Sequence, residues 1–244
     1  MRNYNLLNRL NHSLVTSLLA TVLLVGSAQA EISGVLAGEI IMLVGQSRAT
    51  SAAGEARPLK KGDSVYVGDK IETGKKCYIK FRYTDGGTVL LRPDTVLVID
   101  AYQDTGDGKG ESVSTLLKGG LRSVTGAIST EKKQNYKVNT PVATLGIRGT
   151  DFVMRLCQEG EGPGTNDCDN VNENGLYTST NDGGTKLKNG GGELDSDSGE
   201  HAYVKDFDVP PIQLKEAPRI ISVDNLPNPL DDSPDFIPGN ACGG

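Results

Sequence analysis

The sequence has 244 residues, of which 25 are Lys or Arg and 31 are Asp or Glu, and its formal net charge is −6. That length accommodates one large domain or two small ones, and the acidic balance argues against a nucleic-acid partner, which requires a basic stripe. The charge is uneven, because residues 156–244 hold 17 acidic and five basic residues. We interpret this acidic half as a solvated surface.

Residues 1–30 are typical of a secretory signal peptide. Arg2 and Arg9 supply a positive start, residues 14–25 an apolar stretch, and Ala28-Gln29-Ala30 a small-residue cleavage site. The apolar stretch is shorter than the roughly 20 residues that a membrane-spanning helix needs. We therefore predict cleavage after Ala30, a periplasmic or secreted bacterial protein, and no membrane-spanning segment after cleavage; an uncleaved anchor or an internal helix is the alternative.

Strand patterns dominate the remaining chain. Residues 76–83 alternate between two faces, which predicts a half-buried strand. One face holds Cys77, Ile79, Phe81 and Tyr83, and the other holds Lys76, Tyr78, Lys80 and Arg82. The following Thr84-Asp85-Gly86-Gly87 predicts a hairpin turn, because glycine tolerates positive φ.

Further short strands are expected between turns along the rest of the chain. They cover residues 34–44, 64–67, 88–91, 96–102, 112–117, 121–128, 142–145, 150–156, 174–180, 185–188, 192–194 and 201–204. No window of twelve residues after Ala30 shows convincing helical periodicity. Short strands separated by turns at these intervals predict an all-β sandwich, barrel or solenoid.

These patterns divide the chain into three parts. A signal peptide at 1–30 precedes an all-β domain at 31–205, in which residues 157–173 form a loop rich in Gly, Asn and Asp. Seven of the eleven prolines fall within residues 206–244, so we predict an extended acidic tail with little independent structure there.

The segment Asn139–Phe152 combines a turn, an apolar strand and an arginine between two glycines. Pro141 pushes the residue before it toward extended geometry, and Gly146 and Gly149 allow a sharp turn or a close approach of another chain segment. Arg148 either fixes the framework, by bonding turn carbonyls or Asp151, or contacts an anionic ligand with its fork of donors. We favour the structural role and keep Arg148 and Asp151 as candidate binding residues.

This segment closely resembles the signature of the FecR-domain family, an extracytoplasmic module. The resemblance extends upstream in matching order, through Pro58-Leu-Lys-Lys-Gly-Asp63, Gly68-Asp-Lys-Ile-Glu-Thr-Gly74, Thr84-Asp-Gly-Gly-Thr88, Leu91-Arg-Pro-Asp94 and Lys118-Gly-Gly-Leu-Arg122. It covers roughly residues 34–155 and implies a solenoid-like stack of short strands, with residues 174–205 closing the stack. Regulator-type members carry a cytoplasmic anti-sigma region and one membrane helix; we identify neither here, so the resemblance implies an exported stand-alone domain and leaves sigma-factor signalling open.

Four cysteines follow the predicted cleavage site. Secretion permits disulfides, and four cysteines allow three pairings. Cys157 and Cys168 flank the polar loop, so we predict a bridge between them. Cys77 is expected as a small buried thiol, and the pairing of Cys77 with Cys242 stays open.

Residues for catalysis or metal binding are scarce. His201 is the only histidine after Ala30, which excludes a zinc site with several His ligands, and we assign it a non-catalytic surface role. The acidic loop from Asp195 fails the EF-hand pattern, because glycine falls at position five and Asp206 at position twelve. We predict no enzymatic activity, no catalytic residues, no metal site and no cofactor.

These observations predict a non-catalytic binding or interaction module of the periplasm or cell exterior, with envelope signalling as one form of that role. The alternative is a structural protein of the cell envelope, or one that binds peptidoglycan or polysaccharide. The absence of Trp weakens the alternative and the tyrosines support it. The expected partner is an envelope protein or a cell-wall component.

Overall fold

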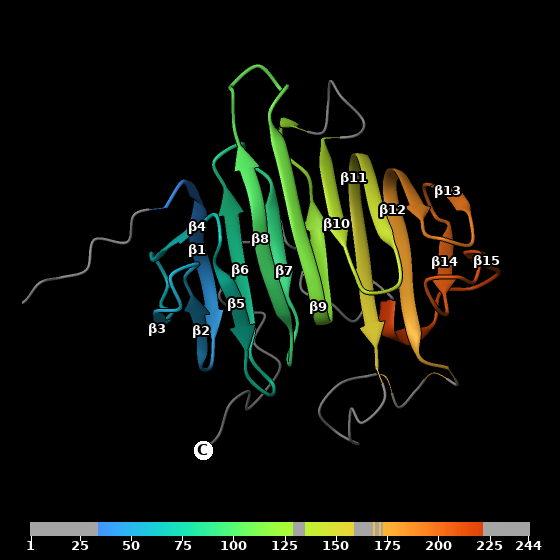
Figure 1. Ribbon diagram of the computed structural model, residues 1–244, viewed down its shortest axis with the longest axis horizontal. Helices are drawn as coiled ribbons and strands as arrows, with labels where there is room; N and C mark the ends of the chain where they lie inside the picture. Colours follow the sequence, from blue (N-terminus) through green and yellow to red (C-terminus); the bar gives the residue numbers. More distant parts are fainter. Residues whose placement is uncertain (1–33, 129–134, 159–167, 169–170, 172, 222–244) are drawn as a thin grey trace, which may run out of the picture. The chain divides into compact units, whose positions relative to one another are not determined.

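The computed structural model describes residues 34–128, 135–158, 168, 171 and 173–221. The predicted signal peptide and residues 222–244 of the predicted tail lie outside this part of the chain. Within it the protein is all-β, as the strand patterns predict (Figure 1). The elements are β1 (Leu36–Val44), β2 (Ser47–Thr50), β3 (Ala56–Pro58), β4 (Ser64–Tyr66), β5 (Lys70–Thr73), β6 (Tyr78–Tyr83), β7 (Thr88–Leu91), β8 (Val96–Gln103), β9 (Glu111–Val124), β10 (Tyr136–Asn139), β11 (Thr144–Cys157), β12 (Gly175–Lys188), β13 (Glu193–Asp197), β14 (His201–Val204), β15 (Ile212–Leu214) and the 3-10 helix η2 (Arg219–Ile221).

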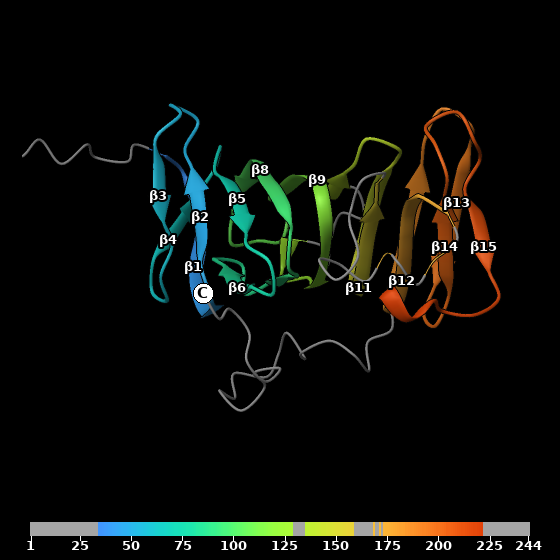
Figure 2. The same cartoon turned by 90° about the horizontal axis from the view of Figure 1, so that it is seen from below.

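The strands form two layers that share one continuous hydrogen-bonded network. Layer A runs β3–β2–β5–β8–β9–β10–β11–β12–β13. Layer B runs β4–β1–β6–β7–β9–β11–β12–β14–β15. The pair β9–β10 is parallel and the other pairs are antiparallel. Figure 2 shows β5 and β8 of layer A in a separate row from β1 and β6 of layer B.

Three long strands belong to both layers, because each bends at a glycine. β9 pairs with β8 and β10 through residues 111–118, then with β7 and β11 through residues 119–124. β11 and β12 divide their pairing between the layers in the same way. The bends lie at Gly119, Gly149 and Gly183, whose positive φ angles of 83°, 55° and 81° glycine adopts without steric cost. The fold is therefore a two-layered sandwich whose layers are connected by bent strands. It combines features of the sandwich and of the solenoid-like stack that the sequence predicts.

One hydrophobic core fills the space between the layers. Layer A contributes Ile71, Leu97 and Leu116, and layer B contributes Phe81 and Met154, all 0–1% exposed. Burial of each such side chain stabilises the fold by about 1.5–3 kcal/mol. Because the inner faces of both layers share this cluster, neither layer has a core of its own.

Tyrosines make one part of this core polar. The Tyr83 ring stacks on Tyr102 at 4.8 Å between centroids, and its hydroxyl lies 3.3 Å from the Ser114 hydroxyl. The Tyr136 and Ser123 hydroxyls are 3.0 Å apart. Burial raises the pKa of Tyr83 to about 12, although the hydrogen bond with Ser114 opposes this shift.

A second apolar cluster lies on the outer face of layer B. It comprises Val153, Cys157, Tyr177, Tyr203, Ile220 and Ile221. Residues 206–221 therefore depart from the extended tail expected there: β15 pairs with β14, and Ile220 and Ile221 of η2 are fully buried. The reason is local, because Pro210 and Pro211 precede an edge strand, where a missing N–H does no harm.

The cysteine bridge predicted from the polar loop is present. Cys157 and Cys168 form a disulfide with an S–S length of 2.00 Å and a Cα–Cα separation of 5.7 Å. Cys77 is buried, as expected, and its thiol donates to the Lys75 carbonyl at 3.2 Å. Cys242 lies outside the described residues.

Candidate functional site

Arg148 and Asp151, the two predicted binding residues, lie on different layers. The Arg148 side chain is 50% exposed on the outer face of layer A, with its Nη2 3.4 Å from Asp197 Oδ1. Asp151 lies on the outer face of layer B, where Arg122 donates to both carboxylate oxygens at 3.1 and 2.7 Å. The bend at Gly149 separates them, so the structure does not bring these two residues together.

Pro141 occupies the loop that joins β10 to β11. The Thr140 hydroxyl accepts a hydrogen bond from the Ala143 amide at 3.0 Å and donates to the Ala143 carbonyl at 2.8 Å. This tight loop sets the pairing in which Lys137 opposes Gly146. The third signature residue, Gly149, provides the bend described above.

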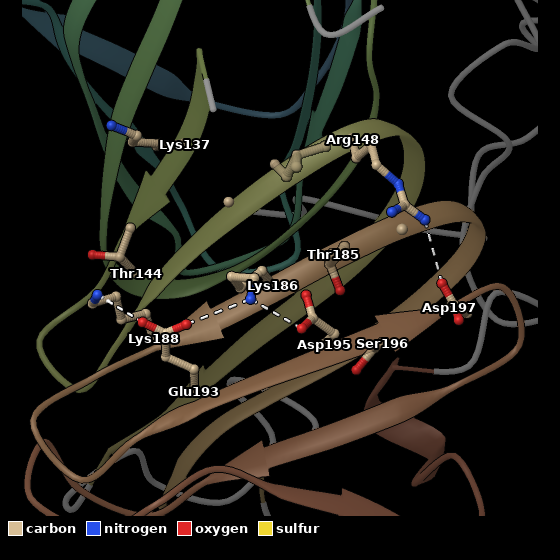
Figure 3. Close-up of a pocket in the computed structure, with 13 residues that line it drawn as sticks. Lys137, Thr144, Arg148, Thr185, Lys186, Lys188, Glu193, Asp195, Ser196 and Asp197 are labelled. Carbon is tan, nitrogen blue, oxygen red and sulfur yellow. Dashed lines mark hydrogen bonds and ion pairs between the residues drawn. The ribbon is translucent and has the colours of Figure 1, made fainter. Parts of the chain in front are cut away.

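Gly146 forms the floor of a groove on the outer face of layer A. Across four strands, Lys137, Gly146, Lys186 and Asp195 pair in one row. A Cβ added at Gly146 would meet only the Lys186 carbonyl, at 3.8 Å, so the space above it is open. The groove has a volume of about 740 Å³, and we call it the Gly146 groove (Figure 3).

The β12–β13 side of the Gly146 groove is internally neutralised. The Lys186 Nζ lies 2.9 Å from Asp195 and 3.4 Å from Glu193, and the Lys188 Nζ lies 2.7 Å from Glu193 (Figure 3). Asp195 raises the pKa of Lys186, and Lys188 lowers the pKa of Glu193. Such exposed pairs contribute little to stability because solvent screens them, so a ligand can replace them with little loss.

The β10–β11 side of the groove carries the surplus positive charge. Lys137 makes no hydrogen bond or ion pair with any residue that the structure describes, and Arg148 holds only the long contact to Asp197. Gly146 and Arg148 are two residues apart on one strand, a separation of about 7 Å. Two cations beside a glycine floor suit a carboxylate, which a guanidinium binds with paired donors.

A second hollow lies at the other end of layer A, with a volume of about 880 Å³. Its arginines already have partners: Arg48 Nε lies 2.9 Å from Glu72, and Arg57 donates to Asp69 at 2.9 Å. The Arg57–Asp69 pair is structural, because Asp69 is 1% exposed and also accepts the Tyr66 amide at 2.9 Å. The two arginines of this hollow are therefore already engaged, and its lining also includes Lys118 and Asp94.

His201 and the acidic residues are the remaining candidates for catalysis or metal binding. His201 begins β14, its Nδ1 lies 3.0 Å from the Ser179 hydroxyl, and burial lowers its pKa. Among the described residues, no three His, Cys, Asp or Glu side chains converge as a metal site would require. Within the described part of the chain, no helix is long and apolar enough to cross a membrane.

Comparison with protein families decides the relationship of this chain. The family model described as FecR protein matches residues 69–165. The match covers less than half of the chain. It extends from the residue before β5 to just beyond β11, so it includes Lys137, Gly146 and Arg148 but not the β12–β13 side of the groove.

Solved structures and curated proteins add little to the FecR assignment. Two crystal structures of a putative anti-sigma factor from Parabacteroides distasonis ATCC 8503, at 1.65 and 2.50 Å resolution, are similar to this chain at 15% sequence identity. Each has a TM-score of 0.46 and covers 61% of this chain. The chain matches 60% of the length of those structures. No curated protein matches it.

Sequence reasoning found Arg148 but missed Lys137 and Lys186. The spacing of Thr144, Gly146 and Arg148 places all three on one face of a strand, which marks Gly146 as a gap between two polar side chains. The lysines come from strands on either side of β11, and only the sheet order reveals that they flank this gap.

Proposed function

We propose that this protein is an exported, non-catalytic binding module of cell-envelope signalling, and that its Gly146 groove recognises a carboxylate-bearing segment of a partner protein in the envelope. The match to the FecR family model supports the envelope context. The single observation that carries the binding role is the open glycine floor beside Lys137 and Arg148.

A carboxylate ligand fits this arrangement better than a sugar. None of the residues that line the groove is aromatic, whereas sugar-binding sites commonly use aromatic faces. The lining instead offers four cations and three carboxylates, with the excess positive charge at Lys137. An extended acidic segment would contact Lys137 and Arg148 through its carboxylates and offer amides to the β13 acids.

Binding is tested by affinity capture from envelope extract with matched variants. Gly146→Leu fills the groove and Lys137→Glu reverses its surplus charge, while Lys61→Glu makes the same charge change at an exposed turn away from the groove. We expect a specific partner to be recovered by the native protein and by Lys61→Glu, and at least ten-fold less by the two groove variants. Equal recovery by all four proteins would refute the groove as the binding site.

Export is tested separately. Fractionation should find the chain outside the cytoplasm, and N-terminal sequencing should begin at Glu31. A chain that keeps Met1 and remains in the cytosol would contradict the exported role without bearing on the groove.

A further inference from the structure

The second hollow of layer A contains two buried oxygen atoms that lack hydrogen-bond partners. Ser47 Oγ and Asp94 Oδ2 are both buried, and neither makes a hydrogen bond with any residue that the structure describes. Both residues line the hollow of about 880 Å³, which we call the Asp94 hollow. A buried acceptor without a donor costs free energy, so these oxygens indicate that a group from outside the chain completes the site.

Thr73 brings the two unpartnered oxygens into one site. Ser47 opposes Thr73 across β2 and β5, and both side chains are buried. The Thr73 hydroxyl donates to the Arg92 carbonyl at 2.6 Å and accepts the Thr95 amide at 2.8 Å. It is therefore attached to the turn that contains Asp94. Thr73 has its own hydrogen bonds, whereas Ser47 and Asp94 Oδ2 beside it have none.

Gly74 provides a second link between the two sides of the site. Its amide donates to the Gln46 carbonyl at 3.2 Å, and its carbonyl accepts the Asp94 amide at 3.2 Å. Gln46 directly precedes Ser47. Asp94 itself has a φ of 53°, in the left-handed region that few residues other than glycine adopt. Residues held in such conformations are frequent at ligand sites.

The charges of the Asp94 hollow leave one base beside the acid. Its two arginines are neutralised by the acidic partners described above. Lys118 lines the hollow and makes no hydrogen bond or ion pair with any residue that the structure describes. It opposes Val96, two residues beyond Asp94, and a Cβ built at Gly119 would lie 2.7 Å from the Asp94 carbonyl. Lys118 is therefore a neighbour of Asp94 without being its partner.

These groups suit a ligand that carries an amine and a carboxylate together. An ammonium group has three donors, so it can donate to Asp94 and to Ser47 at once. A carboxylate on the same molecule would then lie beside Lys118, and the charges would balance. A calcium ion fits less well, because it needs at least about six oxygen ligands and Lys118 would repel it.

Segments singled out in the sequence supply much of this site. Four of the segments that resemble the FecR family contribute to its lining, namely 58–63, 68–74, 91–94 and 118–122. No described residue uses Asp94 Oδ2 or Lys118 Nζ. Packing of the fold therefore does not account for these two charged side chains.

We propose that the Asp94 hollow binds a small zwitterionic molecule of the amino-acid class, with its ammonium on Asp94 and Ser47 and its carboxylate beside Lys118. This site and the Gly146 groove share no lining residue. The proposal therefore adds a small-molecule site to the partner-binding groove and does not rest on it.

The site is tested by amide NMR titration of the isotopically labelled full chain. The probes are glycine, β-alanine, γ-aminobutyrate and ε-aminocaproate, which differ in the separation of amine and carboxylate. Butylamine and butyrate, with one charge each, are the comparison. We expect at least one amino acid to bind at least ten-fold more tightly than both, and to shift the amides of Gln46, Gly74 and Lys118. Equal affinity for butylamine would overturn the role of Lys118, and failure of all four amino acids to bind would overturn the site.

Matched variants identify the groups that bind. Asp94→Asn removes the charge and suits the left-handed conformation, and Lys118→Gln removes the opposite charge; each should weaken binding of the tightest amino acid at least ten-fold. Asp182→Asn and Lys61→Gln make the same changes at exposed positions and should bind like the native chain, as should Lys137→Glu in the Gly146 groove. Native affinity in folded Asp94→Asn or Lys118→Gln would contradict the proposal. If Asp94→Asn does not fold, judged by its amide spectrum, Lys118→Gln decides.

Discussion

Arg122 and Asp151 are joined by two hydrogen bonds from β9 to β11, Nε to Oδ1 at 3.1 Å and Nη2 to Oδ2 at 2.7 Å. Their side chains are 11% and 19% exposed. The Asn181 amide adds a third contact to Asp151 Oδ1 at 3.2 Å. This pair uses the carboxylate that lies three positions from Arg148 in the sequence, so Arg148 is left facing the groove.

Replacement of Asp151 by Asn should destabilise the fold, because it removes the charge from a carboxylate that accepts two hydrogen bonds from the largely buried Arg122 guanidinium. We expect the free energy of unfolding to fall by about 2–3 kcal/mol, measured by urea denaturation. Arg148→Gln is the control: its side chain is half exposed, so stability should change by less than about 0.5 kcal/mol. Equal losses of unfolding free energy in the two variants would show that the Arg122–Asp151 pair does not stabilise the fold more than an exposed side chain does.

The glycines of the signature region should differ sharply in tolerance. Gly119 has a φ of +83°, and a Cβ there would lie 2.4 Å from Thr95 Oγ1 and 2.7 Å from the Asp94 carbonyl. Gly119→Ala should therefore lower the free energy of unfolding by more than about 2 kcal/mol. Gly146→Ala, at an open position of a strand, should be neutral or slightly stabilising. Similar urea midpoints for both variants would contradict the assigned bend.

Loss of the Cys157–Cys168 disulfide should destabilise the protein without changing its fold. The bridge closes a loop with a sequence separation of 11, and the chain-entropy relation assigns about 3 kcal/mol to a loop of that size. The variant with Cys157→Ser and Cys168→Ser should show that loss in urea denaturation and keep its β-type circular dichroism. A midpoint equal to that of the oxidised native chain would show that the bridge does not restrict the unfolded chain as the entropy relation requires.

Alkaline pH should weaken the fold through its buried tyrosines. The folded-state pKa of Tyr83 is raised to about 12, and that of Tyr136 is also raised, in both cases chiefly by burial. A raised pKa means that the folded state retains its proton, so this stability is complete below pH 10, the usual tyrosine value, and is lost as pH rises from 10 toward 12. Between pH 9 and 11, Tyr83 should account for about 1 kcal/mol of the decline.

The comparison for this prediction is Tyr83→Phe, which removes one ionisable group and keeps the aromatic ring. Urea unfolding at pH 9, 10 and 11 should give a shallower decline for the variant than for the native protein. Identical slopes would mean that Tyr83 does not titrate differently in the two states.

Alternation along the chain identified most strands of the core but not their continuity. The patterns at 112–117 and 121–128 were separated by Gly119-Gly120, which is typical of a turn; the structure has one strand there, because positive φ at Gly119 bends the chain without ending it. The strands β2, β3, β5, β10 and β15 were not predicted, and each has only three or four residues. β7 is equally short, but its three consecutive apolar residues identify it, whereas the unpredicted strands have no such run.

Lys80 shows that a local sequence pattern can predict the face of a residue without predicting its burial. Its alternation with Ile79 and Phe81 correctly places it on the outer face, and an outer lysine is normally solvated. Its near-complete burial depends on what covers layer B, and that information is not contained in the local pattern. The Gly146 groove could not be predicted from a local pattern either. Lys137 and Lys186 lie on either side of β11, and this arrangement follows only from the order of strands in the sheet.

The bent strands tie the two layers together covalently. β9, β11 and β12 each supply backbone to both, so neither layer can separate while the other remains intact. The domain should therefore lose its structure in one all-or-none step, with amide hydrogens in the two arms of β9 exchanging through the same global opening. Such a fold should not populate a partly unfolded state in which one layer exposes its apolar face to other molecules.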